Sequence, residues 1–126
     1  MKRGDVCLAR LNPVRGSEQS GSRPVIIVSR DAINRSSPVV IAVPITTFQA
    51  GRRIYPSQVR INAPSGGLRV DSVALCEQVR AMSKDRLVET WGSLSPPVIK
   101  EIDRALLIAM DLPGQLPTED QTDAGN

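Results

Sequence analysis

The residues best placed for chemistry lie where a loop rich in glycine and serine runs into an apolar segment, in GSEQSGSRPVIIVSR at residues 16–30. Arg23 stands at the junction, so a strand that starts there would fix its backbone while the loop leaves its guanidinium exposed. A guanidinium can hold a phosphate through two parallel hydrogen bonds. The competing interpretation is an ordinary surface arginine in an ion pair at a strand edge.

A hydroxyl group is the second candidate, at the end of the apolar segment PVVIAVPIT, residues 38–46. Side chains at a strand end leave the sheet for the surface, and the Thr46 hydroxyl could donate a hydrogen bond to a phosphate oxygen or to a leaving oxygen. Thr47 points to the other face if the strand continues, which makes it the weaker candidate. Either threonine could instead be a β-former that ends a strand.

Composition restricts the chemistry further, because the sequence contains no histidine. Serine–histidine–aspartate triads, histidine acid–base pairs and histidine metal sites are therefore excluded. The scattered carboxylates do not form the cluster that a two-metal site needs. We expect no metal and no cofactor, so catalysis would rest on arginine, carboxylates, hydroxyls, thiols or groups of the substrate.

Charge favours an anionic partner. The formal net charge is +3, with 16 Lys+Arg against 13 Asp+Glu. The segment from Pro113 onward contains three of the acidic residues and no base, so residues 1–112 carry 16 − 10 = +6. Of the basic residues, 13 are arginine, whose planar fork pairs with phosphates and stacks on bases. A small basic domain of this kind is typical of a nucleic-acid partner, although many basic domains only have solvated faces.

A nucleic-acid partner would give other polar residues a role. Glu18 could accept a proton or position Arg23, and Gln19 could read a base edge. Further candidate contacts lie in the loops and strands around these residues: Ser17, Phe48, Arg52, Arg53, Tyr55, Glu77, Gln78, Arg80, Lys84 and Arg86. The competing interpretations are solvated loops and, for Glu77, an ion pair with Arg80. We expect Trp91 in the core.

Cys7 and Cys76 are the only cysteines, and both lie in apolar segments without metal-ligand spacing. We predict two buried, reduced thiols. No apolar run approaches the roughly 18 to 20 residues of a membrane span, and MKRGDV lacks the apolar core of a signal peptide. These features predict a soluble cytoplasmic protein.

Alternating and β-branched segments predict about five to seven strands in the first part of the chain. We expect strands over 4–11, 23–29, 38–46, 58–62 and 72–82, a turn or short helical turn over 30–37, and a turn capped by Ser83 that leads into an extended segment toward Trp91. We expect one long loop between the first two strands and a second long loop over residues 47–57.

The segment SPPVIKEIDRALLIAMDLPG predicts one long helix, with Ser95 as N-cap, Pro96 at its first position and Pro113-Gly114 as its end. Its expected apolar face consists of Val98, Ile99, Ile102, Leu106, Ala109 and Met110. Strands followed by a helix predict an α+β fold with a small, curved, barrel-like antiparallel sheet. We predict one domain over 1–112, and a disordered acidic tail over 113–126.

Four short motifs, RGDV, GSEQ.G.RPVIIVS, PIT and DSV.L.EQVR, occur in this order and spacing from Lys2 to about Leu112. Together they resemble the MazF/PemK-type toxins, the ribonuclease halves of bacterial toxin–antitoxin pairs. The resemblance implies a strongly curved, SH3-like antiparallel barrel with a long C-terminal helix, and a homodimer.

The resemblance also implies metal-independent cleavage of single-stranded RNA at short sequences, with 2′,3′-cyclic phosphate and 5′-hydroxyl products. The family's catalytic arginine and hydroxyl fall on Arg23 and Thr46, and Glu18 falls on the acidic residue of the loop that covers the RNA groove. The nucleophile in such a reaction is the 2′-hydroxyl of the substrate, so a protein without histidine can catalyse it. Arg23 is expected to stabilise charge, because a guanidinium stays protonated at neutral pH.

Two other functions remain open. A related toxin group, the CcdB-like proteins, shares the fold but poisons DNA gyrase, and a third possibility is a non-catalytic module that binds RNA or a protein partner. Arg23 and Thr46 in the family's register favour the nuclease. A cognate antitoxin with an acidic, extended C-terminal segment is implied by the resemblance as a partner, and the net charge of +6 on residues 1–112 is compatible with it.

Overall fold

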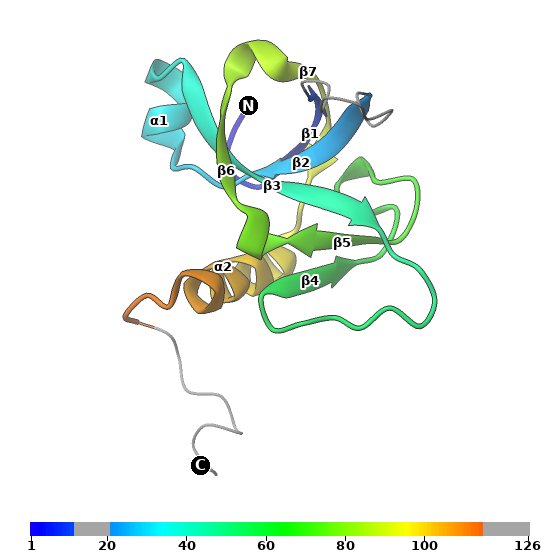
Figure 1. The fold of residues 1–126 in the computed structure, drawn as a ribbon. Helices are drawn as coiled ribbons and strands as arrows, with labels where there is room; N and C mark the ends of the chain where they lie inside the picture. The colour runs from blue at the N-terminus through cyan, green and yellow to red at the C-terminus, as the bar shows by residue number, and fades with distance from the viewer. Residues whose placement is uncertain (12–20, 115–126) are drawn as a thin grey trace, which may run out of the picture.

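The computed structural model describes residues 1–11 and 21–114. In these ranges the chain forms a seven-stranded antiparallel sheet, two helices and three short 3₁₀ turns (Figure 1). The elements are β1 (Asp5–Arg10), β2 (Ser22–Ile27), α1 (Asp31–Ser36), β3 (Val39–Thr47), β4 (Gln58–Ile61), η1 (Ser65–Gly67), β5 (Ser72–Leu75), η2 (Cys76–Gln78), β6 (Arg80–Ser83), η3 (Lys84–Arg86), β7 (Leu87–Ser93) and α2 (Pro96–Met110). The predicted α+β class is confirmed.

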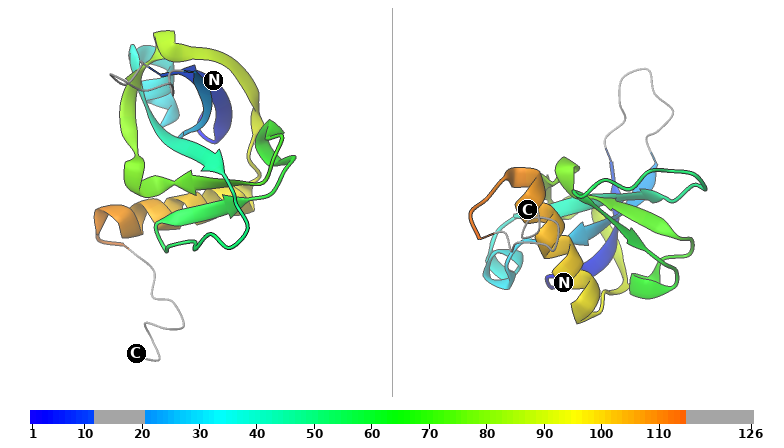
Figure 2. Two further views of the ribbon diagram at one scale, coloured as in Figure 1. Left: turned by 45° about the vertical axis from the view of Figure 1, so that its right-hand side comes forward. Right: turned by 90° about the horizontal axis from the view of Figure 1, so that it is seen from below.

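The sheet runs in the order β4-β5-β3-β2-β1-β7, and β6 pairs with β3. The described residues contain no pairing between β4 and β7, so the sheet is open rather than a closed barrel. It curves strongly, and α2 crosses beneath β4 and β5 (Figure 2). The N-terminal segment contacts β7 and α2, since Ser93 Oγ donates to Asp5 Oδ1 at 2.6 Å and Arg3 pairs with Asp103 at 2.7 Å.

The segment 72–82, which alternation predicts as one strand, is two strands with a 3₁₀ turn between them. Both strands pair with β3: Ile45 faces Ala74, and Ala42 faces Arg80. Three steps along β3 therefore match six steps along the other segment, and η2 accommodates the excess. The interruption lies beside Pro44, which has no amide hydrogen to donate to a neighbouring strand. The prediction of a continuous strand was wrong for this reason.

The apolar core covers both faces of the central strands. On one face Val6, Ile26 and Val43 pack with Ile102 and Ala105 of α2. On the other face lies a second buried cluster, which consists of Cys7, Ala9, Val25, Ile27, Val40, Ala42 and Met82. Two-sided burial explains why these strands are continuously apolar in sequence.

The predicted helix begins and ends close to the expected residues. Ser95 occupies the N-cap position and Pro96 begins the helix, although the Ser95 side chain makes no capping hydrogen bond. The helix ends at Met110, and Asp111 follows in the left-handed conformation at φ 52°. Ile102 is buried as expected, but Met110 is 53% exposed, so its assignment to the apolar face was wrong.

Both cysteines are buried free thiols, as predicted. Burial raises the pKa of Cys76 to about 12 and also raises the pKa of Cys7, so neither is a ready thiolate nucleophile. No helix in the described ranges is long and apolar enough to cross a membrane.

Candidate functional site

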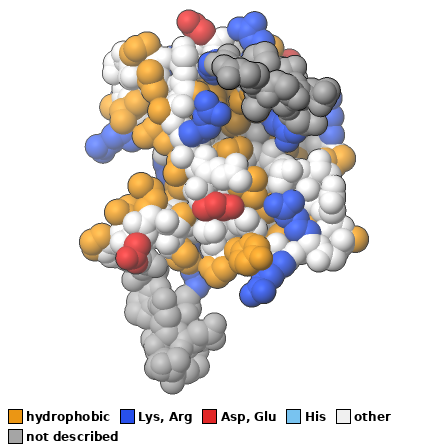
Figure 3. Space-filling model, viewed as in Figure 1, with side chains coloured by type: hydrophobic (Ala, Val, Ile, Leu, Met, Phe, Trp, Pro, Cys, Tyr) orange, Lys and Arg blue, Asp and Glu red, His pale blue; other side chains and the backbone are white. Residues whose placement is uncertain are grey.

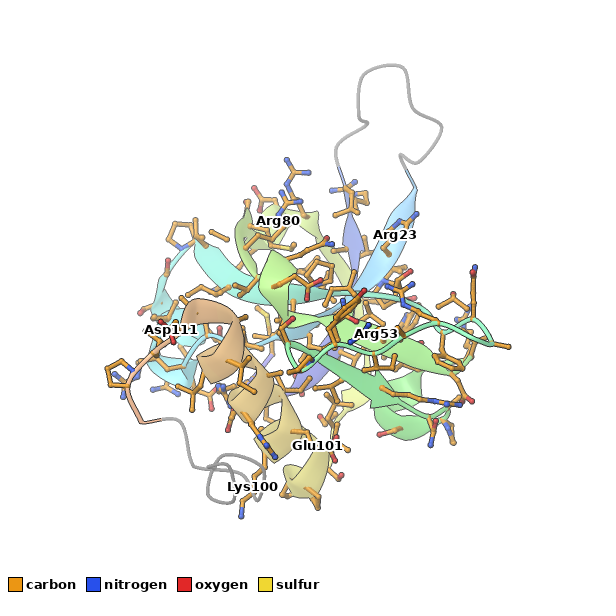
Figure 4. All side chains as sticks on the ribbon, turned by 60° about the horizontal axis from the view of Figure 1, so that its bottom comes forward. Arg23, Arg53, Arg80, Lys100, Glu101 and Asp111 are labelled. Carbon is orange, nitrogen blue, oxygen red and sulfur yellow. The ribbon has the colours of Figure 1, made fainter. Side chains whose placement is uncertain are left out.

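A hollow of about 480 Å³ opens where β2, β3 and the segment before β5 meet. Both leading candidates from the sequence, Arg23 and Thr46, line it. The full lining consists of Gly21, Ser22, Arg23, Pro24, Ile45, Thr46, Thr47, Leu68, Arg69, Val70, Ser72 and Trp91. We call this hollow the Arg23 pocket, and Figure 4 shows the position of Arg23 on β2.

The pairing of β2 with β3 brings the segments that carry Arg23 and Thr46 to the same pocket. Val25 faces Pro44 in the last pair of this antiparallel ladder, and Arg23 and Thr46 each lie two residues beyond that pair. Since side chains alternate along a strand, Arg23 lies on the face of Val25, and Thr46 lies on the face of Ala42. The pocket itself borders the first core cluster, because Ile45 and Leu68 of that cluster line it and no member of the second cluster does. The arrangement joins one guanidinium and one hydroxyl on two well-ordered strands.

The surroundings of Thr46 support its place at the pocket. Thr46 is half-buried and faces Val73 of β5, whereas Thr47 is exposed and faces Ser72. Thr47 also lines the pocket. Because β3 continues through both threonines, two hydroxyl groups are available here rather than one.

Two pocket residues did not stand out in the sequence. The Arg69 guanidinium carbon lies 4.9 Å from the centroid of the Trp91 ring, and Trp91 Nε1 donates to Glu89 Oε2 at 2.9 Å. We expected Trp91 in the core, and it does pack against the core, although it is only half-buried. It also lines the pocket. Stacking of arginine on an aromatic ring is common in structures. Arg69 and Trp91 are far apart in the sequence, so no sequence motif indicates that they form such a pair.

The basic loop between β3 and β4 lies outside this lining. Arg53 stacks over Tyr55 at 5.0 Å, and Figure 4 shows Arg53 on that loop. The Arg60 guanidinium carbon instead lies 3.8 Å from the centroid of the Phe48 ring. One face of this ring is therefore covered, whereas we expected the ring to be free to stack on a base. Arg52 is half-buried in the same loop. Figure 3 shows basic side chains on several parts of this side of the molecule rather than in one stripe.

The predicted polar set at EQVR does not join the pocket either. Glu77 and Gln78 lie in η2, and Glu77 accepts hydrogen bonds from Ser57 Oγ at 3.3 Å and Gln58 Nε2 at 2.9 Å. Arg80 is exposed on β6. The η2 turn explains why Glu77 lies away from the pocket. It directs the Glu77 side chain toward β4, whereas we expected Glu77 to lie on a continuous strand.

Basic residues also occur near β1, in and around η3. Ser83 caps this turn as predicted, since its Oγ accepts a hydrogen bond from the Asp85 amide at 3.2 Å. Arg86 donates to the Arg10 carbonyl at 3.4 Å, and Lys84 is half-buried in the same turn. A second, open hollow of about 390 Å³ lies between these residues and the end of β1.

Three predicted residues, Ser17, Glu18 and Gln19, lie outside the described residues, as does the segment 115–126 of the predicted tail. Among residues 1–11 and 21–114, no three His, Cys, Asp or Glu side chains are grouped so that they could hold a metal ion.

Known proteins of one family match this chain over nearly its whole length. The family model described as PemK-like, MazF-like toxin of type II toxin–antitoxin systems matches residues 2–110. The Endoribonuclease MazF of Staphylococcus saprophyticus subsp. saprophyticus is 44% identical over 112 residues, which are 89% of this chain and 92% of that protein.

Solved structures agree with these matches. An endoribonuclease in complex with its cognate antitoxin from a mycobacterial species superposes with a TM-score of 0.72 at 27% identity, over 90% of this chain and 97% of that chain. A MazE–MazF crystal structure from Deinococcus radiodurans gives a TM-score of 0.72 at 26% identity, over 88% and 96% of the two chains.

Proposed function

Since this chain belongs to the family of PemK-like, MazF-like toxins of type II toxin–antitoxin systems, we propose that it is an endoribonuclease that cleaves single-stranded RNA and is neutralised by a cognate antitoxin. The observation that carries this proposal is the placement of Arg23 and Thr46 in the lining of one pocket. A guanidinium and a hydroxyl fixed on neighbouring strands suit a phosphodiester better than a flat protein surface.

The reaction is a transesterification within the RNA. The substrate 2′-oxygen bonds to the adjacent phosphorus, the bond from phosphorus to the 5′-oxygen breaks, and the products are a 2′,3′-cyclic phosphate and a 5′-hydroxyl. One proton leaves the 2′-hydroxyl and one proton reaches the 5′-oxygen, so no water and no redox partner is consumed. Arg23 stabilises the charge on the phosphorane.

Thr46 donates a hydrogen bond to a non-bridging oxygen or to the leaving oxygen. Glu18 accepts the proton of the 2′-hydroxyl or positions Arg23. The RNA chain continues past the pocket along further polar contacts, which we propose are Ser17, Gln19, Thr47, Phe48, Arg52, Arg53, Tyr55, Glu77, Gln78, Arg80, Lys84 and Arg86. The pairing of Phe48 with Arg60 makes Phe48 the weakest member of this set.

The open, curved sheet is a variant of the small SH3-like barrel, in which β3 is the strand shared by β2, β5 and β6. The folded domain spans residues 1–112. Strong curvature around β3, and the irregular register between β1 and β7 with shifts at Val6/Cys7 and Leu8/Ala9, support this assignment.

The protein acts as a homodimer in the cytoplasm, where its RNA substrate occurs. Val39 and Ile41 support a dimer, because they point away from the second core cluster and are 40% and 38% exposed on β3. Ala81, also exposed, faces Ile41 across the β3–β6 pair. The net charge of +6 on residues 1–112 favours an antitoxin with an acidic, extended segment.

Incubation of the full-length protein with a long single-stranded RNA in EDTA tests the proposed function. We expect cleavage to cyclic phosphate and 5′-hydroxyl ends, and loss of cleavage in Arg23→Ala. Intact RNA together with stalled gyrase would instead identify a gyrase poison, and bound but uncut RNA would identify a non-catalytic module.

A further inference from the structure

One wall of the Arg23 pocket has no role in the phosphate chemistry described above. This wall consists of Leu68, Arg69, Val70 and Trp91, which line the same hollow as Arg23 and Thr46. Arg69 and Trp91 are stacked in this wall, and the Arg69 guanidinium carbon lies 4.9 Å from the Trp91 ring centroid. A group bound at Arg23 would therefore have a planar, cationic and aromatic surface beside it.

Close backbone packing brings this pair together. Gly67 adopts φ +79°, and a Cβ there would lie 2.4 Å from the Trp91 carbonyl oxygen. A Cβ on Gly92 would lie 2.8 Å from the Gly66 carbonyl carbon. Glycines at these positions let the η1 turn pack directly on β7. Arg69, two residues after Gly67, is thereby held over Trp91.

Two further contacts hold the pair in place. Leu68, between Gly67 and Arg69, is 3% exposed and anchors the turn in the core. Trp91 Nε1 donates to Glu89, which fixes the orientation of the ring. A preorganised surface loses little conformational entropy on binding.

On the premise of the proposed RNA cleavage, we propose that Arg69 and Trp91 form a binding subsite for a nucleobase that flanks the scissile phosphate. Unstacked bases of single-stranded RNA stack on aromatic rings and on arginine planes. The guanidinium also presents N–H donors at its edge, and guanine offers O6 and N7 as two acceptors on one edge. The subsite therefore favours guanine at one position next to the cut.

Cleavage mapping on one long RNA tests the preference. The wild-type protein should cut next to sites enriched in guanine at one fixed flanking position. In Arg69→Ala this enrichment should fall by about five- to hundredfold, the range of discrimination that one bidentate arginine–guanine contact provides. Arg35→Ala, which removes the same charge from an exposed position on α1, is the matched control and should keep the enrichment.

The conservative variant Arg69→Lys separates planar recognition from charge. Lysine keeps the positive charge but lacks the planar fork, so the enrichment should fall as it does in Arg69→Ala. Full rescue by lysine would reduce Arg69 to a general phosphate contact and would overturn the proposal.

Trp91 offers a second readout, because it is the only tryptophan in the sequence. The probe is an oligonucleotide that carries the mapped cleavage sequence with 2′-deoxyribose at the attacking position, which removes the nucleophile. Its binding should change Trp91 emission with the same midpoint as the fluorescence anisotropy of the labelled oligonucleotide. Trp91→Phe should abolish the emission signal.

Failure of the subsite and failure of the proposed function give different results. Anisotropy that rises without any change in Trp91 emission, together with unchanged cut sites in Arg69→Ala, would overturn the subsite and leave the nuclease intact. A wild-type protein that neither binds nor cuts RNA would overturn both.

Discussion

Arg23 and Thr46 each lie two residues beyond the Val25–Pro44 pair of β2 and β3, and both line one pocket. Each residue is paired with a further strand, Arg23 with Ala9 of β1 and Thr46 with Val73 of β5. A guanidinium and a hydroxyl that line one hollow are two groups that can bind the same phosphate. The first two predictions follow from this relationship.

Arg23→Ala should lower the rate of RNA cleavage by about 100- to 1,000-fold, because it removes the cation that faces the developing phosphorane charge. Initial rates on a labelled RNA would measure this loss. Arg23→Lys should recover part of it, because lysine restores the charge but not the two parallel hydrogen bonds. A wild-type rate in Arg23→Ala, with the fold intact by circular dichroism, would remove Arg23 from the mechanism.

Thr46→Val should lower the cleavage rate by roughly 10- to 100-fold, as expected for the loss of one hydrogen bond to a charged group. Valine has nearly the same shape, so the strand should be retained. Thr47→Val is the matched variant at the adjacent, more exposed position and should lower the rate less. The opposite order in single-turnover kinetics would assign the catalytic hydroxyl to Thr47.

Gly67→Ala should destabilise the protein more than Gly51→Ala does. Both glycines have positive φ, at +79° and +84°, but a Cβ at position 51 meets nothing within 4 Å. Gly51→Ala should therefore cost only the strain of the left-handed backbone, about 1 to 2 kcal/mol. Gly67→Ala adds a clash with Trp91, worth a further 1 to 3 kcal/mol or so. Urea unfolding of the two variants would compare them, and equal free energies of unfolding would show that the η1 turn moves freely off β7.

Stability should fall in alkaline solution through Cys76. Burial raises the pKa of this thiol from an ordinary 9.0 to about 12. In the unfolded chain the thiol ionises first, so the unfolded state binds fewer protons and the free energy of unfolding falls as pH rises from about 9 to about 12. Urea unfolding at about pH 8 and about pH 10.5 would measure the fall. Cys76→Ala should show a smaller fall, and an identical fall would assign the effect to other groups.

The sequence was sufficient to select Arg23 and Thr46, which line one pocket in the structure, because each lies where an apolar strand-forming run meets a polar segment. Such boundaries are visible in a linear pattern, and side chains at strand ends reach the surface. Cys7 and Cys76 were predictable for a related reason, since their apolar neighbours on both sides indicate burial.

The Arg69–Trp91 pair could not be predicted in the same way. It depends on a close approach of η1 to β7, which only the three-dimensional packing of Gly66, Gly67 and Gly92 reveals. The break at η2 was equally hidden, because alternation continues across residues 72–82 and the reason lies in Pro44 on another strand. Met110 fits the helical period, but the core ends before it.

The pairing of β1 with β7 has a consequence for synthesis on the ribosome. Asp5 faces Ser93, and Arg3 forms an ion pair with Asp103 on α2. These contacts of the N-terminal segment cannot form until Ser93 and Asp103 have been synthesised. Contacts of such long sequence separation form late, and translation adds only about 5 to 20 residues each second. A nascent chain therefore lacks the Trp91 wall of the pocket until translation is nearly complete, and a truncated product ending before β7 should be harmless to the cell that makes it.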